Sequence, residues 1–118
     1  MTRFAERPET ERIRELNDRF RRTLTGGTVS ITPAVQSLPP DQLRALLEKI
    51  QTFTDFESSD DPYGEHDFGA VEIGDPSGVA SFFWKIDYYG LSLDQASPDP
   101  TDPAVTKRVM TIMRSDEY

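Results

Sequence analysis

Four acids and the only histidine of the chain lie within one eight-residue segment, at Asp60, Asp61, Glu65, His66 and Asp67. Carboxylates combined with one imidazole suit manganese, iron or zinc, and a histidine can also act as a general base near neutral pH. The segment therefore predicts a chemical site. Its metal form would use Glu65, His66 and Asp67 to bind a divalent cation, and its acid–base form would place His66 as the base.

Turn chemistry explains the same residues without a ligand. Asp60 and Asp61 can cap a proline turn, Gly64 can supply a positive φ, and His66 can open a strand with its ring hydrogen-bonded locally. The spacing does not match an EF-hand loop, which needs a different ladder of oxygen ligands and a closing glutamate. We favour this structural interpretation and keep the metal or acid–base site as the alternative.

A second candidate lies in the segment WKIDYY, residues 84–89. Lys85 and Asp87 share a strand face with Tyr89, and Asp87 could orient the imidazole of His66 if the two met across a hairpin. The catalytic candidates are then His66, Asp87 and Glu65. The simpler interpretation is an exposed Lys85–Asp87 pair that contributes little to stability, with aromatic side chains covering the sheet surface.

The composition limits the classes of protein to consider. The chain has 118 residues, a net charge of −8 and no cysteine, which predicts one domain over residues 1–118 and excludes disulfides, thiolate zinc sites and cysteine nucleophiles. No apolar run approaches the ~20 residues of a membrane span, and the charged N-terminal segment lacks the apolar stretch of a signal peptide. We therefore expect a cytoplasmic protein that does not bind membranes.

The charge is unevenly distributed. Residues 55–102 hold twelve acids against one base, Lys85, so this region opposes direct nucleic-acid binding and favours basic partners or cations. Residues 1–22 hold seven arginines, but five acids interleave with them, as on a solvated helix face. Walker, Rossmann, GxSxG and HExxH motifs are absent from the sequence.

Periodicity and turn residues predict an α+β fold. The expected elements are a helix over 8–24, a strand over 28–32, a helix from about 40 to 54, strands over 66–73 and 79–89 joined by a hairpin turn at 74–78, and a helix from Asp102 onward. The order α-β-α-β-β-α predicts amphipathic helices packed on a mostly antiparallel sheet of about three strands. Residues 1–8 are expected to form a flexible arm, 54–65 an acidic loop, and 90–101 an irregular connection containing proline and aspartate.

Three segments together carry a resemblance to a known family: DPYGEHDFG at 61–69, WKIDYY at 84–89, and RVMTIM at 108–113 followed by Glu117 and Tyr118. From about Ile13 to Tyr118 the chain resembles short bacterial proteins grouped as domain-of-unknown-function family 3768, in which an aspartate often follows the two tyrosines where this chain has Gly90. The family has no assigned activity. Its occurrence on alphaproteobacterial chromosomes, plasmids and other mobile elements implies a setting of defence, counter-defence or maintenance.

The leading hypothesis is a non-enzymatic acidic module that docks on a basic protein partner, such as one that itself binds nucleic acid. The predicted binding residues are Asp60, Asp61, Tyr63, Glu65, Asp67, Lys85 and Tyr89. This hypothesis needs no cofactor. The alternative is a small metal-dependent or acid–base enzyme built on Glu65, His66 and Asp67, and a homodimer through the sheet edge or through Phe83 and Tyr89 is a third possibility.

Overall fold

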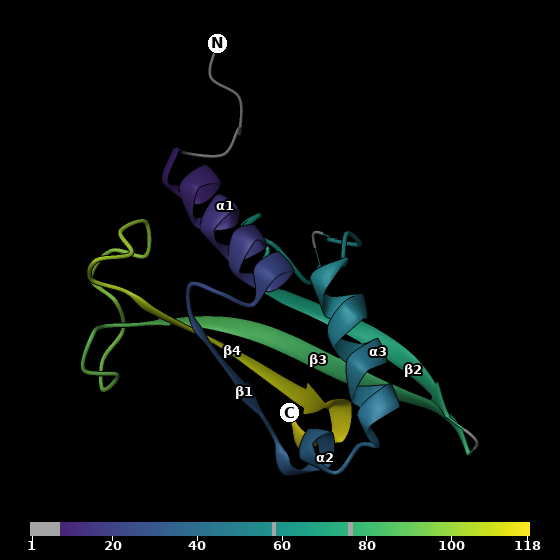
Figure 1. Ribbon diagram of the computed structural model, residues 1–118. Coiled ribbons are helices and arrows are strands. Elements are labelled where there is room, and N and C mark those ends of the chain that lie inside the picture. Colours follow the sequence, from purple (N-terminus) through teal and green to yellow (C-terminus); the bar gives the residue numbers. More distant parts are fainter. Residues whose placement is uncertain (1–7, 58, 76) are drawn as a thin grey trace.

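The computed structural model describes residues 8–57, 59–75 and 77–118 (Figure 1). The predicted flexible arm, residues 1–8, lies outside these described residues except for Pro8. Within them the elements are α1 (Pro8–Thr23), β1 (Thr28–Ile31), α2 (Pro33–Gln36), α3 (Pro40–Gln51), β2 (Phe68–Asp75), β3 (Gly78–Tyr89), β4 (Lys107–Arg114) and the 3₁₀ helix η1 (Ser115–Glu117).

The α+β class is confirmed, and the sheet differs in detail from the expectation. In the described part of the chain, four strands form one sheet in the order β1-β4-β3-β2, where three mostly antiparallel strands were predicted. β3 pairs antiparallel with both β2 and β4, whereas β1 pairs parallel with β4. The sheet is therefore mixed, and its outer strands are β1 and β2.

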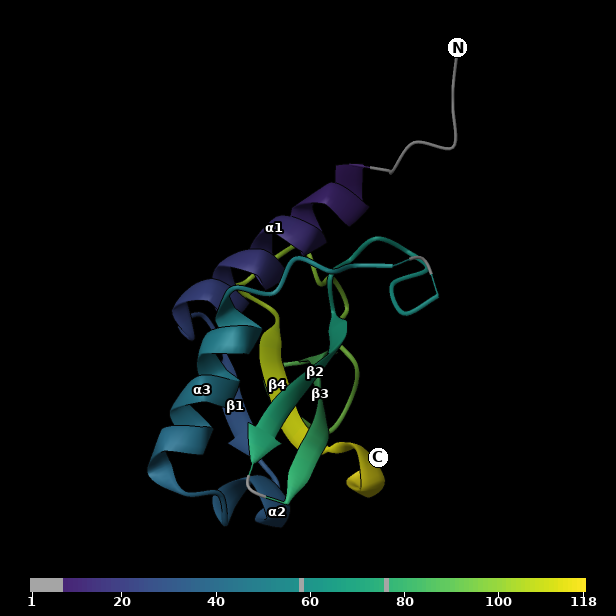
Figure 2. The same cartoon turned by 90° about the vertical axis from the view of Figure 1, so that its right-hand side faces the viewer.

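The helices α1 and α3 lie on the same face of the sheet, and Figure 2 shows both of them to one side of it. Each has an apolar stripe, as predicted: Ile13 and Phe20 are buried on α1, and Leu46 and Ile50 on α3. Phe20, Leu46 and Ile50 pack on the strand residues that point toward them, and the resulting core lies between the helices and the sheet.

The β2–β3 hairpin confirms the predicted face of the second strand. Phe82, Trp84 and Ile86 alternate toward the helices and are almost fully buried. Gly69 pairs with Trp84, and a Cβ at Gly69 would lie 2.4 Å from the indole Nε1. Only glycine leaves room for the indole at this position.

The predicted C-terminal helix is wrong. Residues Lys107–Arg114 form β4, inserted between β1 and β3. Arg108, Met110 and Ile112 alternate toward the core, with the period of two that a strand requires. Asp102 does not cap a helix, because its Oδ1 accepts a hydrogen bond from the Ala104 N–H within a turn. Pairing with two strands outweighed a local sequence pattern that also suited a helix.

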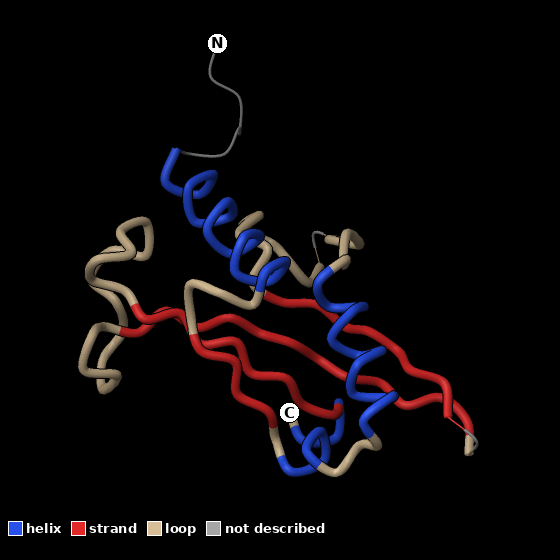
Figure 3. Tube along the Cα trace, in the orientation of Figure 1, coloured by secondary structure: helices blue, strands red, loops and turns tan. Residues whose placement is uncertain are grey.

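Two further differences concern short or irregular segments. The four-residue helix α2, which begins at Pro33, was not predicted. Residues 90–106 form the connection between β3 and β4, drawn as a long loop at one end of the sheet in Figure 3. A short bridge between Tyr89 and Ala96 holds the start of this connection. No helix among the described residues is long and apolar enough to cross a bilayer.

The carboxylate of Glu117 fixes the end of the chain against the rest of the fold. It accepts hydrogen bonds from Thr32 Oγ1 at 2.6 Å, from the Ala34 N–H at 3.2 Å and from the Arg114 N–H at 2.7 Å. These contacts join η1 to the start of α2. The neighbouring Tyr118 is thereby held on the sheet face opposite the helices, against Phe83.

Candidate functional site

The loop between α3 and β2 has an inner side, which faces α1, and an outer side. His66 lies on the inner side with φ of 56°, so it belongs to the loop and does not open a strand as expected. Its ring stacks on Phe56 with centroids 3.6 Å apart. Its Nδ1 lies 2.9 Å from Asp18 Oδ1, and its Nε2 lies 3.8 Å from Asp61 Oδ2. Both ring nitrogens therefore face carboxylates.

The two carboxylates that flank His66 are also held in place. Asp61 is buried, and its Oδ1 accepts a hydrogen bond from the His66 N–H at 3.1 Å. Burial tends to raise the pKa of Asp18, but hydrogen bonds and charges from Arg21 and His66 outweigh it and lower that pKa. Asp18 is therefore a paired anion. In the same loop, Gly64 has a φ of 72° and supplies the positive φ predicted for this turn.

Glu65 joins a chain of hydrogen bonds that runs on the helix side of the sheet from the loop to β4. Its Oε1 accepts from the Tyr88 hydroxyl at 2.8 Å, and that hydroxyl accepts from Asn17 Nδ2 at 2.7 Å. Arg108 Nε donates to Asn17 Oδ1 at 2.8 Å, and its guanidinium lies over the Tyr88 ring. Burial raises the pKa of Tyr88 and lowers that of Arg108. We call Asn17, Asp18, Glu65, His66, Tyr88 and Arg108 the inner network.

A second buried cation stands beside this network. The guanidinium of Arg21 lies near the rings of Phe56 and Trp84 and donates to Asp18 Oδ1 at 2.8 Å and to the Phe53 carbonyl at 3.2 Å. The loop is thus fixed to α1 by aromatic packing and charge-assisted hydrogen bonds together.

These contacts bear directly on the predicted metal and acid–base residues. The Glu65 side chain bonds Tyr88 and the His66 ring bonds Asp18, so the two side chains have different partners. Asp87 lies 3.3 Å from Lys85 Nζ, and the ring contacts of His66 are with Asp18, Asp61 and Phe56. Among the described residues, no group of three histidine, cysteine, aspartate or glutamate side chains is arranged to hold a metal ion.

The outer side of the loop borders a surface hollow of about 430 Å³, which we call the acidic hollow. Its lining consists of Ser59, Asp60, Pro62, Tyr63, Asp67, Phe68 and Tyr118. Three of these residues, Asp60, Tyr63 and Asp67, were predicted as binding residues. The side chains of Tyr63 and Tyr118 are conspicuously open to solvent, with 78% and 76% of each residue exposed.

Aromatic rings form one wall of the acidic hollow. The ring centroid of Tyr118 lies 6.1 Å from that of Phe68 and 5.4 Å from that of Phe83. Phe68 and Phe83 are themselves neighbours on β2 and β3, with centroids 5.3 Å apart. This cluster lies on the sheet face that α1 and α3 leave uncovered.

Asp67 is electrostatically distinct from the acids of the inner network. Burial, together with the negative charges of Glu65, Asp61 and Asp87, raises its pKa to about 6 despite a backbone hydrogen bond that lowers it. Its surroundings therefore hold more negative charge than positive. A cation placed beside Asp67 would relieve this imbalance.

The remaining predicted binding residues lie farther along β3. Lys85 and Asp87 form the expected same-face pair, and each side chain is 39% exposed. Tyr89 ends the strand and is half-buried beside the bridge to Ala96. Asp61 and Glu65 belong to the inner side of the loop, so of the seven predicted binding residues only Asp60, Tyr63 and Asp67 meet at the acidic hollow.

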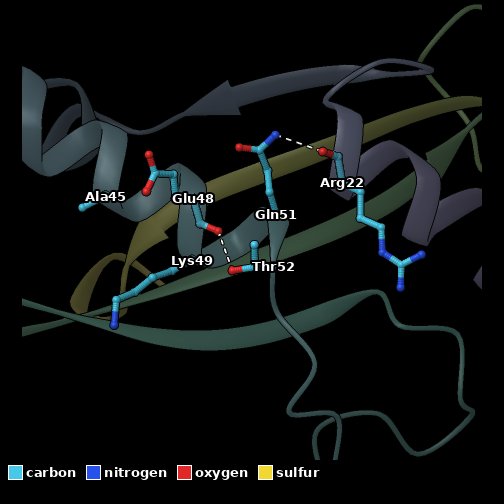
Figure 4. Close-up of a pocket in the computed structure, with 6 residues that line it drawn as sticks. All are labelled: Arg22, Ala45, Glu48, Lys49, Gln51 and Thr52. Atoms are coloured by element: carbon cyan, nitrogen blue, oxygen red, sulfur yellow. Dashed lines mark hydrogen bonds between the residues drawn. The ribbon is translucent and has the colours of Figure 1, made fainter.

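A further hollow of about 610 Å³ lies between the end of α1 and α3, with different chemistry (Figure 4). Gln51 donates to the Arg22 carbonyl at 3.0 Å across it, and Thr52 Oγ1 donates to the Glu48 carbonyl at 2.8 Å. Its ionic side chains are the two cations Arg22 and Lys49 and the single acid Glu48, and no aromatic residue lines it. It lacks the excess of acid found at the acidic hollow.

Sequence reasoning missed two sets of residues. Phe68 and Tyr118 join the acidic hollow from β2 and from the residue after η1, and only their place within the segments that carry the family resemblance marked them. Asn17, Asp18 and Arg108 complete the inner network from α1 and β4. The one available signal for Arg108 was its alternation with Met110 and Ile112, which would bury an arginine if the segment were a strand.

The fold and the loop define a small α+β domain with an acidic, aromatic hollow on its uncovered sheet face. The chain belongs to the family described as "Protein of unknown function (DUF3768)", whose model matches residues 31–117. The match begins at the end of β1, so it includes the loop but not α1, which the loop contacts. Comparisons with curated proteins and with solved structures gave no match.

Proposed function

We propose that this protein is a non-enzymatic acidic module that binds a basic segment of a protein partner at the acidic hollow. The observation that carries the proposal is the meeting of Asp60 and Asp67 with the exposed rings of Tyr63 and Tyr118 around one concave surface. Carboxylates attract lysine or arginine by charge, and aromatic faces attract the same cations through their quadrupole.

The charge of the molecule supports the same proposal. The net charge of −8 steers basic partners toward the chain and repels phosphate backbones, so a protein surface is a better candidate than nucleic acid itself. A basic partner that binds nucleic acid would meet a surface that partly imitates a phosphate track. The mobile-element setting implied by the family resemblance is compatible with such a role.

The alternative, a metal or acid–base site at Glu65, His66 and Asp67, has less support. Glu65 and His66 are held by Tyr88 and Asp18 in the inner network, so neither is directed at an open cavity together with Asp67. The inner network acts as a structural support for the loop. The outer side of the same loop is available for binding.

A short synthetic peptide that alternates lysine with threonine tests the proposal directly. Its binding to the full chain is measured by fluorescence anisotropy at low and at high salt, with a glutamate–threonine peptide as the control. We expect binding of the lysine peptide alone, with an affinity that falls as salt rises. Equal binding of both peptides, or no binding of either, would contradict the proposal.

Paired variants locate the binding surface. Asp60→Asn with Asp67→Asn removes both acids of the hollow, and we expect the lysine peptide to bind about tenfold more weakly. Asp41→Asn with Glu48→Gln removes the same charge from exposed positions on α3 and serves as the matched control. An equal loss in the two variants would mean that only net charge matters, and the hollow would not be the site.

A further inference from the structure

β2 forms an outer edge of the sheet, because the strand order ends at β2 and β3 is its only partner among the described strands. It is eight residues long, Phe68–Asp75, which is ample for another strand to pair with. An edge strand has one row of backbone N–H and C=O groups that its own sheet does not use. The geometry of the hairpin identifies which residues carry that row.

The Ile86 N–H donates to the Asp67 carbonyl at 2.8 Å, so residue 67 directs its backbone groups toward β3. Residues alternate along an antiparallel pair, so residues 69, 71 and 73 also face β3. The backbone groups of Phe68, Ala70 and Glu72 therefore point away from the sheet. Within the described part of the chain, no hydrogen bond is formed to these outward groups.

The surroundings of this edge are open. Ala70 and Glu72 are both exposed. A hollow of about 640 Å³, lined in part by Lys49, Ala70, Glu72 and Phe83, continues along β2 where the acidic hollow stops at Phe68. The two hollows thus lie one after the other along β2, the first at Asp67 and Phe68 and the second at Ala70 and Glu72.

We propose that the basic segment of the partner binds as an added fifth strand along the outer edge of β2, an inference that rests on the proposed function. Backbone hydrogen bonds to Phe68, Ala70 and Glu72 would supply affinity independent of sequence, as in other cases of β-strand addition. Side chains of the added strand would then alternate between the two faces of the sheet.

This alternation specifies the partner's sequence. On the face that carries the acidic hollow, an added side chain meets Asp67, Glu72 and the aromatic wall, so lysine or arginine is favoured there. On the helix face, β2 has the buried apolar side chains of Val71 and Ile73, which attract no cation, whereas Lys49 of α3 lines the same hollow as Glu72. The occupant is therefore an extended segment with basic residues at every second position and uncharged residues between them.

A second copy of this chain is a poorer occupant of the edge. Each copy carries a net charge of −8, and pairing β2 with β2 would bring the acidic hollows and the two Glu72 side chains toward each other. Like charges opposed across a strand pair are destabilising. Sedimentation of the free protein distinguishes the cases, because a stable β2-paired dimer would occupy the edge and overturn the inference.

Selective N-methylation tests strand addition with the lysine–threonine peptide. One isomer is methylated on the lysine amides and the other on the threonine amides, so both keep the same charges. In a strand, alternate amides point to opposite sides, so we expect one isomer to lose binding and the other to retain it. Equal affinity of the two isomers would overturn strand addition.

A backbone change in the protein gives the complementary test. Ala70→Pro removes only an outward N–H, which an edge strand tolerates, and we expect about tenfold weaker peptide binding. Ala70→Thr keeps the N–H and should bind normally, and unfolding curves verify that both variants fold. If the peptide binds through Asp60 and Asp67 but is insensitive to N-methylation and to Ala70→Pro, the strand inference fails while the proposed function stands. If the peptide does not bind, both fail.

Discussion

The two sides of the 59–67 loop use similar residues for opposite purposes. On the inner side, the carboxylates of Asp61 and Glu65 have specific partners, and the buried cations Arg108 and Arg21 are hydrogen-bonded. On the outer side, Asp67 lies near other acids, no cation of the described residues pairs with it, and the tyrosines that border the hollow are largely exposed. Satisfied polar groups stabilise a fold, whereas an unbalanced charge beside exposed rings is a feature that a binding partner can complete.

The largest expected effect comes from the inner network. Asn17→Ala removes the acceptor of Arg108 and the donor to Tyr88 in one change, leaving the buried Nε–H of Arg108 without its acceptor. We expect the free energy of unfolding to fall by about 3 kcal/mol, measured by urea denaturation. Gln51→Ala, which removes an exposed amide bonded to the Arg22 carbonyl, is the control and should cost about 1 kcal/mol or less. A similar small loss for both variants would contradict the structural role of the network.

Removing an acid from the acidic hollow should raise the free energy of unfolding, whereas removing Asn17 should lower it. The pKa of Asp67 is raised from 3.8 to about 6, so the folded state holds this proton more tightly than the unfolded state does. The contribution of Asp67 is therefore most favourable below 3.8 and is lost as the pH rises through 6. Because asparagine does not ionise, Asp67→Asn should be more stable than the natural chain above pH 6.

Urea unfolding across a pH series measures this difference. The advantage of Asp67→Asn should shrink steadily as the pH falls toward 3.8, while its binding of the lysine peptide is weaker at neutral pH. A variant that gains stability and loses binding marks a position kept for function. An Asp67→Asn protein that is less stable than the natural chain at neutral pH would place Asp67 with the inner network instead.

The smallest expected effect concerns Lys85. Its ion pair with Asp87 is partly exposed on both sides, so Lys85→Gln should change the free energy of unfolding by about 0.5 kcal/mol or less. Removing this cation from the uncovered sheet face should leave lysine-peptide binding unchanged or slightly tighter. A marked loss of peptide binding would show that Lys85 contacts the peptide, contrary to the site we define.

The elements that the sequence predicted correctly are those with local signals. The stripes of α1 and α3 and the alternation in β3 each follow from residues close together in the chain. β4 was mispredicted because Val105, Val109 and Ile112 also fit a helical period, and the strands that pair with β4 are distant in sequence. A short stretch of sequence contains no information about such non-local pairing.

The candidate site was likewise predictable only in part. The segment 60–67 was recognised by its unusual composition, but composition does not determine which side of a loop each side chain faces. The positive φ of His66 turns its ring to the inner side beside Asp18, a residue of α1. Tyr118 reaches the acidic hollow only because Glu117 is bonded to Thr32 and Ala34, about eighty positions earlier.

The position of β4 has a consequence for synthesis of the protein. β4 is the last of the described strands in chain order, yet it lies between β1 and β3, pairing with β3 along its length and with β1 over Val109–Ile112. A growing chain that has not yet added Lys107–Arg114 holds β1 without a partner and a hairpin with an open inner edge. The sheet is therefore completed only when β4 is added. Chains that lack β4 expose the unpaired edges of β1 and β3, which favours aggregation or chaperone binding.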